Sequence, residues 1–253
     1  MIELDNIYNM DCLEGMKMIP DGSVDAIICD LPYGVLNSES EGGSWDAVIP
    51  FGSLWEQYLR ITKPASPIVL FAQGMFTADL MQSNRKMWRY NLVWNKTRAT
   101  GHLNARKMPL RSHEDIVVFY RELPKYNPQF TKGEPNHSRG KMEKEQTNRC
   151  YGKANKPTDI FTEDKFPKSI IDIPNKINGN WHPTQKPLDL LRYLVLTYTN
   201  PCDTVLDNTC GSGTTCLAAA LEGRHYIGFE LNKEYYDRAV KRIKEETRQL
   251  SLF

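Results

Sequence analysis

A glycine-rich run in the last quarter of the sequence has the residue types of a nucleoside-binding loop. Its residues are Asp207-Asn208-Thr209-Cys210-Gly211-Ser212-Gly213-Thr214. An apolar strand pattern precedes the run, and Glu230 follows 19 residues after Gly211. Glycines let a backbone approach a ligand closely, and a carboxylate at this spacing can accept from both ribose hydroxyls. The run is neither GxGxxG nor GxxxxGK[ST], so a nucleoside without a phosphate chain fits best; a tight turn without a ligand is the alternative.

Two further groups of residues could act with this loop. Asp30-Leu31-Pro32-Tyr33 follows a buried strand pattern, where a carboxylate, main-chain carbonyls and an aromatic ring can grip a planar base that bears an amine. His182-Pro183-Thr184-Gln185-Lys186-Pro187 leads into a helix pattern, and polar donors there suit a carboxylate ligand. Each has an ordinary explanation as well, namely a turn after a strand and a helix start with Thr184 as N-cap.

Taken in chain order (tetrapeptide, then residues 182–187, then the glycine-rich run), the three groups resemble the beta group of S-adenosylmethionine-dependent DNA amino-methyltransferases, from about Asn6 to Lys244. Members carry a [DNS]-P-P-[YFW] tetrapeptide, a target-recognition segment, HPTQKP and a glycine-rich cofactor loop. Leu31 replaces the first proline of the tetrapeptide, and its carbonyl remains available. The resemblance implies catalytic roles for Asp30, Leu31, Pro32 and Tyr33. It implies S-adenosyl-L-methionine binding by Asp11, Cys12, Thr184, Gln185, Lys186, Asp207, Asn208, Gly211, Gly213, Thr214 and Glu230.

Within that set, the resemblance places Glu230 on the ribose of the cofactor, Asp11 on its adenine amino group, and residues 184–186 near its methionine end. Arg111-Ser112-His113-Glu114-Asp115-Ile116 also resembles a family block, without an assigned role. The resemblance further implies methyl transfer to a base flipped out of double-stranded DNA, because an exocyclic amine is out of reach inside the stack. An aspartate in the tetrapeptide favours adenine N6. Cytosine N4, an RNA substrate, or a binding protein without turnover are the alternatives.

Strand and helix patterns alternate in two regions of the chain. Strands are expected at Val24–Cys29, Ile68–Ala72, Tyr90–Trp94, Asp115–Tyr120, Thr204–Leu206 and Tyr226–Phe229; helices are expected at Ser53–Thr62, Met75–Ser83, Pro187–Tyr198, Thr214–Leu221 and from about Lys233. Such alternation predicts an α/β fold with a doubly wound, mostly parallel sheet. Because the cofactor loop comes after the catalytic tetrapeptide, the expected fold is a circularly permuted Rossmann-like methyltransferase.

The segment between these regions differs in composition. Residues 121–180 contain six prolines and few apolar clusters, which is typical of a binding loop inserted into a domain. We therefore expect a catalytic half over 1–120, a target-recognition insertion over 121–180 and a cofactor-binding half over 181–253. Residues 85–168 hold 19 Lys/Arg against 9 Asp/Glu, although the whole chain has a net charge of +1. This basic segment predicts DNA contact, with Arg139, Lys141 and Arg149 as candidates, unless it is only a solvated loop.

The composition excludes several other classes of protein. Of the 253 residues, 40% are hydrophobic and 25% charged, and no apolar run reaches the ~18 residues that span a bilayer. The six cysteines form no CxxC pair, so we expect a reduced, cytoplasmic protein without disulfides or a metal site. A homodimer and a cognate restriction nuclease are possible partners by resemblance, and no membrane partner is expected.

Overall fold

The computed structural model describes residues 2–35, 46–134, 147–148, 152–153, 163–176 and 185–248. These residues fall into two compact units. The first, here called the sheet unit, comprises Met1–Asn127 and Ser169–Phe253, and the second, the small unit, comprises Pro128–Lys168.

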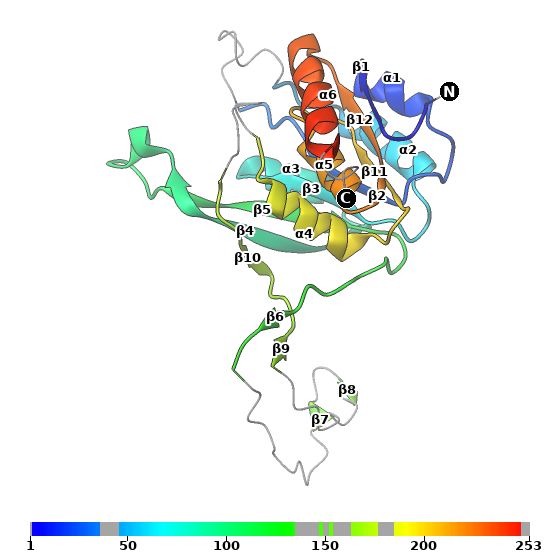
Figure 1. Ribbon diagram of the computed structural model, residues 1–253. Coiled ribbons are helices and arrows are strands. Elements are labelled where there is room, and N and C mark those ends of the chain that lie inside the picture. The colour runs from blue at the N-terminus through cyan, green and yellow to red at the C-terminus, as the bar shows by residue number, and fades with distance from the viewer. Residues whose placement is uncertain are drawn as a thin grey trace. The chain divides into compact units, whose positions relative to one another are not determined.

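An eight-stranded sheet forms the centre of the sheet unit (Figure 1). In spatial order its strands are β1 (Asn6–Asn9), β12 (His225–Glu230), β11 (Thr204–Asp207), β2 (Ala26–Asp30), β3 (Ile68–Ala72), β5 (Arg111–Phe119), β4 (Trp88–Thr100) and β10 (Ile170–Asp172). All neighbouring strands are parallel except β5, which runs antiparallel to both β3 and β4.

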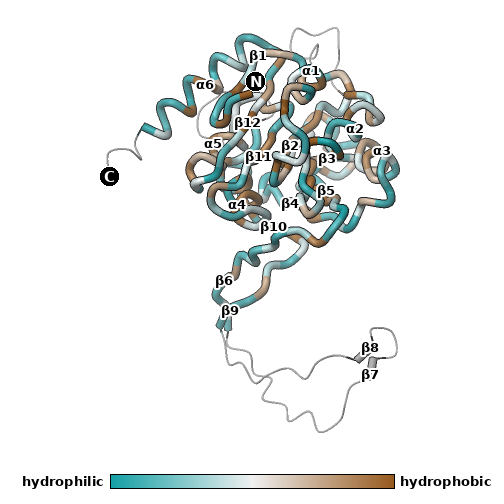
Figure 2. The backbone as a smooth tube through the Cα atoms, turned by 90° about the vertical axis from the view of Figure 1, so that its right-hand side faces the viewer, coloured by the Kyte–Doolittle hydropathy of each residue, from teal (hydrophilic) through white to brown (hydrophobic). Residues whose placement is uncertain are grey.

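Helices cover both faces of this sheet. They are α1 (Cys12–Lys17), α2 (Phe51–Ile61), α3 (Met75–Ser83), α4 (Leu188–Tyr198), α5 (Thr214–Leu221) and α6 (Lys233–Arg248). Successive side chains of a strand point to opposite faces, so each strand contributes to two cores. Ile28 packs with α4, α5 and α6, whereas Ile27 and Cys29 pack with α1, α2 and α3. Burial on both faces explains the continuous apolar runs of β2 and β3, and Figure 2 shows apolar residues concentrated along the central strands.

The strand order confirms the predicted permuted fold. From β11 the chain passes to β12 and then, across the termini, to β1 on the same side; from β2 it moves to β3 on the other side. The order therefore reverses between β11 and β2. In doubly wound sheets, ligands bind outside the carboxyl ends of the strands at such a reversal. Asp207 and Asp30 end these two strands.

Most expected elements are present, with two informative differences. β3, α3 and α5 have the predicted bounds. β4 and β5 extend as a hairpin past the predicted segments, because their outer residues are polar and carry no core pattern. The short helix α1 was not expected; Asp11 initiates it by accepting hydrogen bonds from the backbone N–H groups of Leu13 and Glu14.

The small unit contains two pairs of short strands. β6 (Thr131–Lys132) pairs with β9 (Asp164–Lys165), and β7 (Thr147–Asn148) pairs with β8 (Gly152–Lys153), both antiparallel. The rings of Phe130 and Phe166 pack 4.9 Å apart beside the first pair. Residues 121–127 and 169–176, which the sequence analysis placed in the insertion, belong to the sheet unit. The DNA-contact candidates Arg139, Lys141 and Arg149 lie outside the described residues.

Three general features concern the described part of the chain. None of its helices is both long and apolar enough to cross a membrane. It contains no group of three or more His, Cys, Asp or Glu side chains arranged to hold a metal ion. The five cysteines in the described ranges are free, and all but Cys202 are buried.

Candidate active site

A cavity of about 390 Å³ opens where β11 and β2 end, and it brings together residues from all three sequence motifs. The predicted site residues that line it are Asp30, Leu31, Pro32, Tyr33, Gln185, Lys186, Asp207, Gly211 and Thr214. This volume is within the usual range for small-molecule sites. The cavity therefore joins the tetrapeptide to the glycine-rich loop.

The carboxylate of Asp30 has two side-chain partners. Its Oδ1 accepts a hydrogen bond of 2.8 Å from the Tyr33 hydroxyl, and its Oδ2 lies 2.5 Å from Nζ of Lys186. A carboxylate offers about four lone-pair positions, so the two oxygens can still accept from a ligand. Asp30 is thus oriented by its partners and remains able to bind a donor in the cavity.

Lys186 connects Asp30 to a chain of buried charges. Its Nζ lies 3.3 Å from Oε2 of Glu114, and the other oxygen of Glu114 forms an ion pair with Lys96. The side chains of Lys186, Glu114 and Lys96 are each 10% exposed or less. Two lysines therefore alternate with two carboxylates, and each charge in the buried row has an opposite neighbour.

The pKa values in this row follow from burial and from these neighbours. Burial raises the pKa of Asp30, with Lys186 opposing it. Burial alone would lower the pKa of Lys186, but the negative charges of Asp30 and Glu114 outweigh burial, and the pKa of Lys186 is raised. Burial alone would raise the pKa of Glu114, but the positive charges of Lys186 and Lys96 outweigh burial, and the pKa of Glu114 is lowered. Lys186 is therefore held as a cation, and its charge favours the ionised form of Asp30.

The departure of Leu31 from the family tetrapeptide has a packing explanation. Leu31 is only 4% exposed and belongs to the core under α1, α2 and α3. An apolar side chain of suitable size meets that requirement, whether or not it is proline. The following Tyr33 packs its ring against Phe76, with ring centroids 4.9 Å apart. The turn is thus anchored by Leu31 and Phe76, and the polar atoms of Asp30 reach the cavity.

The glycine-rich loop connects β11 to α5 through left-handed backbone. Gly211 and Gly213 have φ values of 51° and 70°, which glycine adopts without strain. A Cβ on Gly213 would lie 3.1 Å from Ala239 and 3.2 Å from Ile7. The loop therefore needs glycine at position 213 for both its conformation and its packing. The backbone N–H of Gly211 donates to Oε2 of Glu230 at 2.9 Å.

Buried polar groups hold this loop from both sides. Arg242 of α6 is 2% exposed and donates to the carbonyl of Ser212 and, at 2.9 Å, to the hydroxyl of Thr214. On the opposite side, Asp207 accepts from the N–H of Thr209, and burial raises the pKa of Asp207 to about 7. The loop is therefore braced by Arg242, which follows the loop residues it contacts by 28 to 30 positions in the chain.

Three predicted cofactor residues have mainly supporting contacts in the structure. Asp11 caps α1 through Oδ1. The side-chain Oδ1 of Asn208 accepts a 2.5 Å hydrogen bond from the hydroxyl of Tyr58. Cys12 is buried, which raises the pKa of its thiol to about 11 and keeps it neutral. These three residues, like Gly213 and Glu230, do not line the cavity. Thr184 lies outside the described residues.

Unpartnered polar atoms show that the cavity suits a polar ligand. Oε1 of Gln185 and Oδ1 of Asn175 are buried and have no hydrogen-bond partner among the described residues, and both residues line the cavity. Buried acceptors of this kind cost free energy unless a donor reaches them. The ammonium and hydroxyl groups of a nucleoside that carries an amino acid, such as S-adenosylmethionine, are donors of the required kind. The residues present therefore fit this cofactor.

Two charged residues of the row beside Asp30, Lys96 and Glu114, had no role predicted from the sequence. Lys96 and Glu114 come from β4 and β5, which form the far wall of the cavity. Glu114 lies in the 111–116 block, whose family resemblance could have indicated that it contributes a residue to the site. The contact of Arg242 with the loop could not be predicted from the sequence, because Arg242 is one of many charged residues in an amphipathic helix, α6.

Comparison with known proteins agrees with this geometry. The N6_N4_Mtase family model, described as a DNA methylase, matches residues 24–241. The chain belongs to this family. The match confirms the family resemblance that the motifs predicted and identifies the protein as a member of an enzyme family that methylates DNA.

Curated relatives and solved structures extend the comparison. The chain is 29% identical over 266 residues to the type II methyltransferase M.HinfI of Haemophilus influenzae, covering 96% of this chain and 69% of that one. It is 27% identical to the DNA adenine methyltransferase YhdJ of Escherichia coli K12, covering 95% and 83%.

Two solved structures share the fold. One is the complex of M1.HpyAVI with SAM (TM-score 0.62, 22% identity, 94% and 98% covered). The other is the PvuII cytosine-N4-specific DNA methyltransferase (TM-score 0.66, 18% identity, 95% and 90% covered). Because one of these proteins is cytosine-specific, the shared fold does not by itself show whether the target amine is on adenine or cytosine.

Proposed function

We propose that this family member transfers a methyl group from S-adenosyl-L-methionine to the exocyclic N6 amine of an adenine flipped out of double-stranded DNA. The observation that carries the proposal is that one cavity is lined both by the oriented carboxylate of Asp30 and by the glycine-rich loop. A hydrogen-bond acceptor for an amine and a backbone cradle for a nucleoside therefore meet at the reversal point of the sheet. The name of the relative YhdJ supports adenine as the target.

Asp30 and the carbonyls that follow it act on the amine by accepting hydrogen bonds from its N–H groups. The lone pair of an exocyclic amino nitrogen is delocalised into the ring, so the amine is a weak nucleophile. Hydrogen bonds from its two N–H groups to Asp30 and to the carbonyl of Leu31 or Pro32 favour a pyramidal nitrogen with an available lone pair. The carbonyl of Asp30 already accepts from Thr209 at 2.9 Å, which leaves those of the next two residues for the base. Positioning and electrostatics then lower the barrier.

Tyr33 and Lys186 hold this acceptor in place. The hydroxyl of Tyr33 fixes Asp30 Oδ1, and the Tyr33 ring provides an aromatic wall for the flipped base. Lys186 keeps Asp30 ionised, so the carboxylate accepts hydrogen bonds from the amine. The proton leaves the nitrogen during or after methyl transfer, so Asp30 does not need to act as a strong base.

On the other side of the cavity, the chain holds the cofactor. When bound, S-adenosylmethionine supplies an electrophilic methyl group on a sulfonium. We assign Asp207, Gly211, Gly213 and Thr214 to the cradle, Glu230 to the ribose hydroxyls, and Asp11, with Cys12 and Asn208 beside it, to the adenine end. Gln185 offers an unpartnered acceptor for the ammonium of the methionine end, and Thr184 and Lys186 complete that group.

The test is a methyl-transfer assay on unmethylated genomic DNA, followed by nucleoside analysis. N6-methyladenine is the expected product. N4-methylcytosine alone would reassign the target amine, and methylation of RNA alone would reassign the substrate. An absence of transfer with intact cofactor binding would indicate a nucleic-acid-binding protein that has kept the fold.

Sequence-specific recognition is assigned to the proline-rich insertion over residues 121–180, together with the flanking basic residues from Arg85. Its charge supports this assignment, since each neutralised phosphate adds about 0.9 to the negative slope of log affinity against log salt. Deleting residues 135–156, which include Arg139, Lys141 and Arg149, should change the recognition site or flatten that slope. An enzyme with the same site and slope would contradict the assignment. A homodimer and a partner nuclease stay predictions, to be tested by sedimentation and co-purification.

A further inference from the structure

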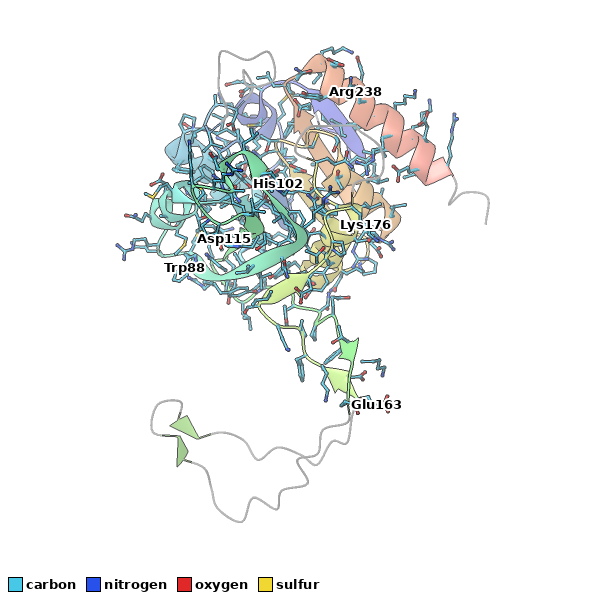
Figure 3. All side chains as sticks on the ribbon, turned by 90° about the vertical axis from the view of Figure 1, so that its left-hand side faces the viewer. Trp88, His102, Asp115, Glu163, Lys176 and Arg238 are labelled. Carbon is cyan, nitrogen blue, oxygen red and sulfur yellow. The ribbon has the colours of Figure 1, made fainter. Side chains whose placement is uncertain are left out.

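The β4–β5 hairpin extends beyond the body of the sheet unit (Figure 1). Thr100 still pairs with Arg111 after a break in register, and the tip between them turns through Gly101, at φ 88°, and the short helix η1 (His102–Asn104). His102 marks this tip in Figure 3. Residues 101–109 are all exposed, so the tip packs against little of its own unit.

The hairpin carries uncompensated positive charge. Residues 97–111 contain four Lys/Arg and no Asp or Glu. Arg98, Arg106 and Lys107 form no ion pair with any residue in the described part of the chain. A protruding element with several free cations suits a polyanion.

An apolar side chain stands at the end of this basic element. Leu103 is 101% exposed and lies in η1, and Met108 nearby is 50% exposed. An exposed leucine alone has no special meaning. Here, however, it lies in a defined turn among cations, and apolar wedges that enter DNA between base steps are presented in this way.

The base of the same hairpin forms a wall of the catalytic cavity through Trp94, Lys96, Thr100 and Arg111. A base that enters the cavity therefore leaves its duplex within reach of the tip. We propose that the hairpin tip binds the duplex next to the target base, with Leu103 filling the gap in the stack and Arg98, Arg106 and Lys107 on the phosphates. This inference rests on the proposed function and adds to it the element that opens the duplex.

The wedge is tested with Leu103→Ala. The substrate is a duplex carrying the site that methylation-sensitive sequencing finds in cells expressing the protein. The variant should methylate this paired duplex about tenfold more slowly than the wild type, since opening a paired base costs the most. On a duplex with the target base mispaired, the two rates should agree within about twofold. Leu4→Ala is the matched control, because Leu4 is 45% exposed and lies outside both the hairpin and the 121–180 segment.

The possible outcomes separate this inference from the proposed function. Equal rates for Leu103→Ala and the wild type on paired DNA overturn the wedge, and so does a loss of rate that mispairing does not restore. A wild-type protein that methylates no DNA overturns the proposed function and this inference together.

The phosphate contacts are tested with Arg106→Gln/Lys107→Gln. The slope of log affinity against log salt should become less negative by about 1.8, because two phosphate contacts are lost. Lys241→Gln/Lys244→Gln on α6 removes the same charge elsewhere on the sheet unit and should change the slope much less. Equal slopes for the two double variants contradict the phosphate contacts.

Discussion

The two sides of the catalytic cavity are built in different ways. The proposed cofactor side is lined mainly by one stretch of chain, residues 207–215. Hydrogen bonds hold this stretch, from the N–H of Gly211 to Glu230 and from Arg242 to the hydroxyl of Thr214. The proposed catalytic side is a row of buried charges from β2, β4, β5 and the segment just before α4, in which Asp30 and Lys186 are 156 residues apart in the chain.

This difference has a physical consequence. A loop whose polar groups are held by several separate hydrogen bonds tolerates the loss of one of these bonds, because the others remain. A buried row of alternating charges does not, since removing one member leaves its neighbour uncompensated. Substitutions on the catalytic side should therefore change charge states and rates, whereas those on the cofactor side should change mainly affinity.

The largest effect is expected from Asp30→Ala. It removes the acceptor that orients the amine, so methyl transfer should fall by about three orders of magnitude, while cofactor affinity stays nearly unchanged. Single-turnover transfer and calorimetry measure the two quantities. Substantial turnover by the variant would defeat the assignment of Asp30.

A smaller but diagnostic effect is expected from Lys186→Met. Without the cation, burial and Glu114 both raise the pKa of Asp30, so its ionised form needs a higher pH. The acid limb of the pH–kcat profile should move upward by about 1–3 units. Lys186→Met/Glu114→Gln removes the facing carboxylate and should move the limb part of the way back. An unshifted limb in the single variant would mean that the two sides of the cavity do not differ as described.

On the cofactor side, Glu230→Ala should weaken S-adenosylmethionine binding by about 1.5–3 kcal/mol and leave kcat at saturation nearly unchanged. Glu230→Gln keeps an acceptor for the N–H of Gly211 and should lose less. Glu234→Ala, on the exposed side of α6, is the control and should bind normally. Calorimetry showing wild-type affinity in a folded Glu230→Ala variant would remove Glu230 from the site.

The last expected effect concerns stability and is the smallest when it is expressed per pH unit. The pKa of Asp207 is about 7 in the folded protein against an ordinary value of 3.8, so between these pH values the folded state retains a proton that the unfolded state has released. The free energy of unfolding should therefore fall as pH rises from 4 to 7, by on the order of 1 kcal/mol per pH unit. Asp207→Asn should lack this contribution. Urea unfolding at pH 5 and pH 7 gives the slopes, and equal slopes for both proteins would contradict the raised pKa.

The sequence by itself determined the cofactor side and the order of the fold. The glycines at 211 and 213, the carboxylate 19 residues on, and the alternation of strand and helix patterns are local signals, because a turn or a strand is defined by residues that are neighbours in the chain. The same is true of the tetrapeptide at Asp30, whose position after a buried strand indicated where its side chain would lie.

Only the tertiary structure decided which distant groups surround Asp30. Glu114 contacts Lys186, the partner of Asp30, and Lys96 contacts Glu114 in turn. These contacts form because β5 runs antiparallel to its neighbours, and that pairing brings positions on two strands to one wall of the cavity. Arg242 reaches the loop because α6 packs beside α5. These contacts join residues that are far apart in the chain. The sequence around a lysine, glutamate or arginine does not show which buried residue will compensate its charge.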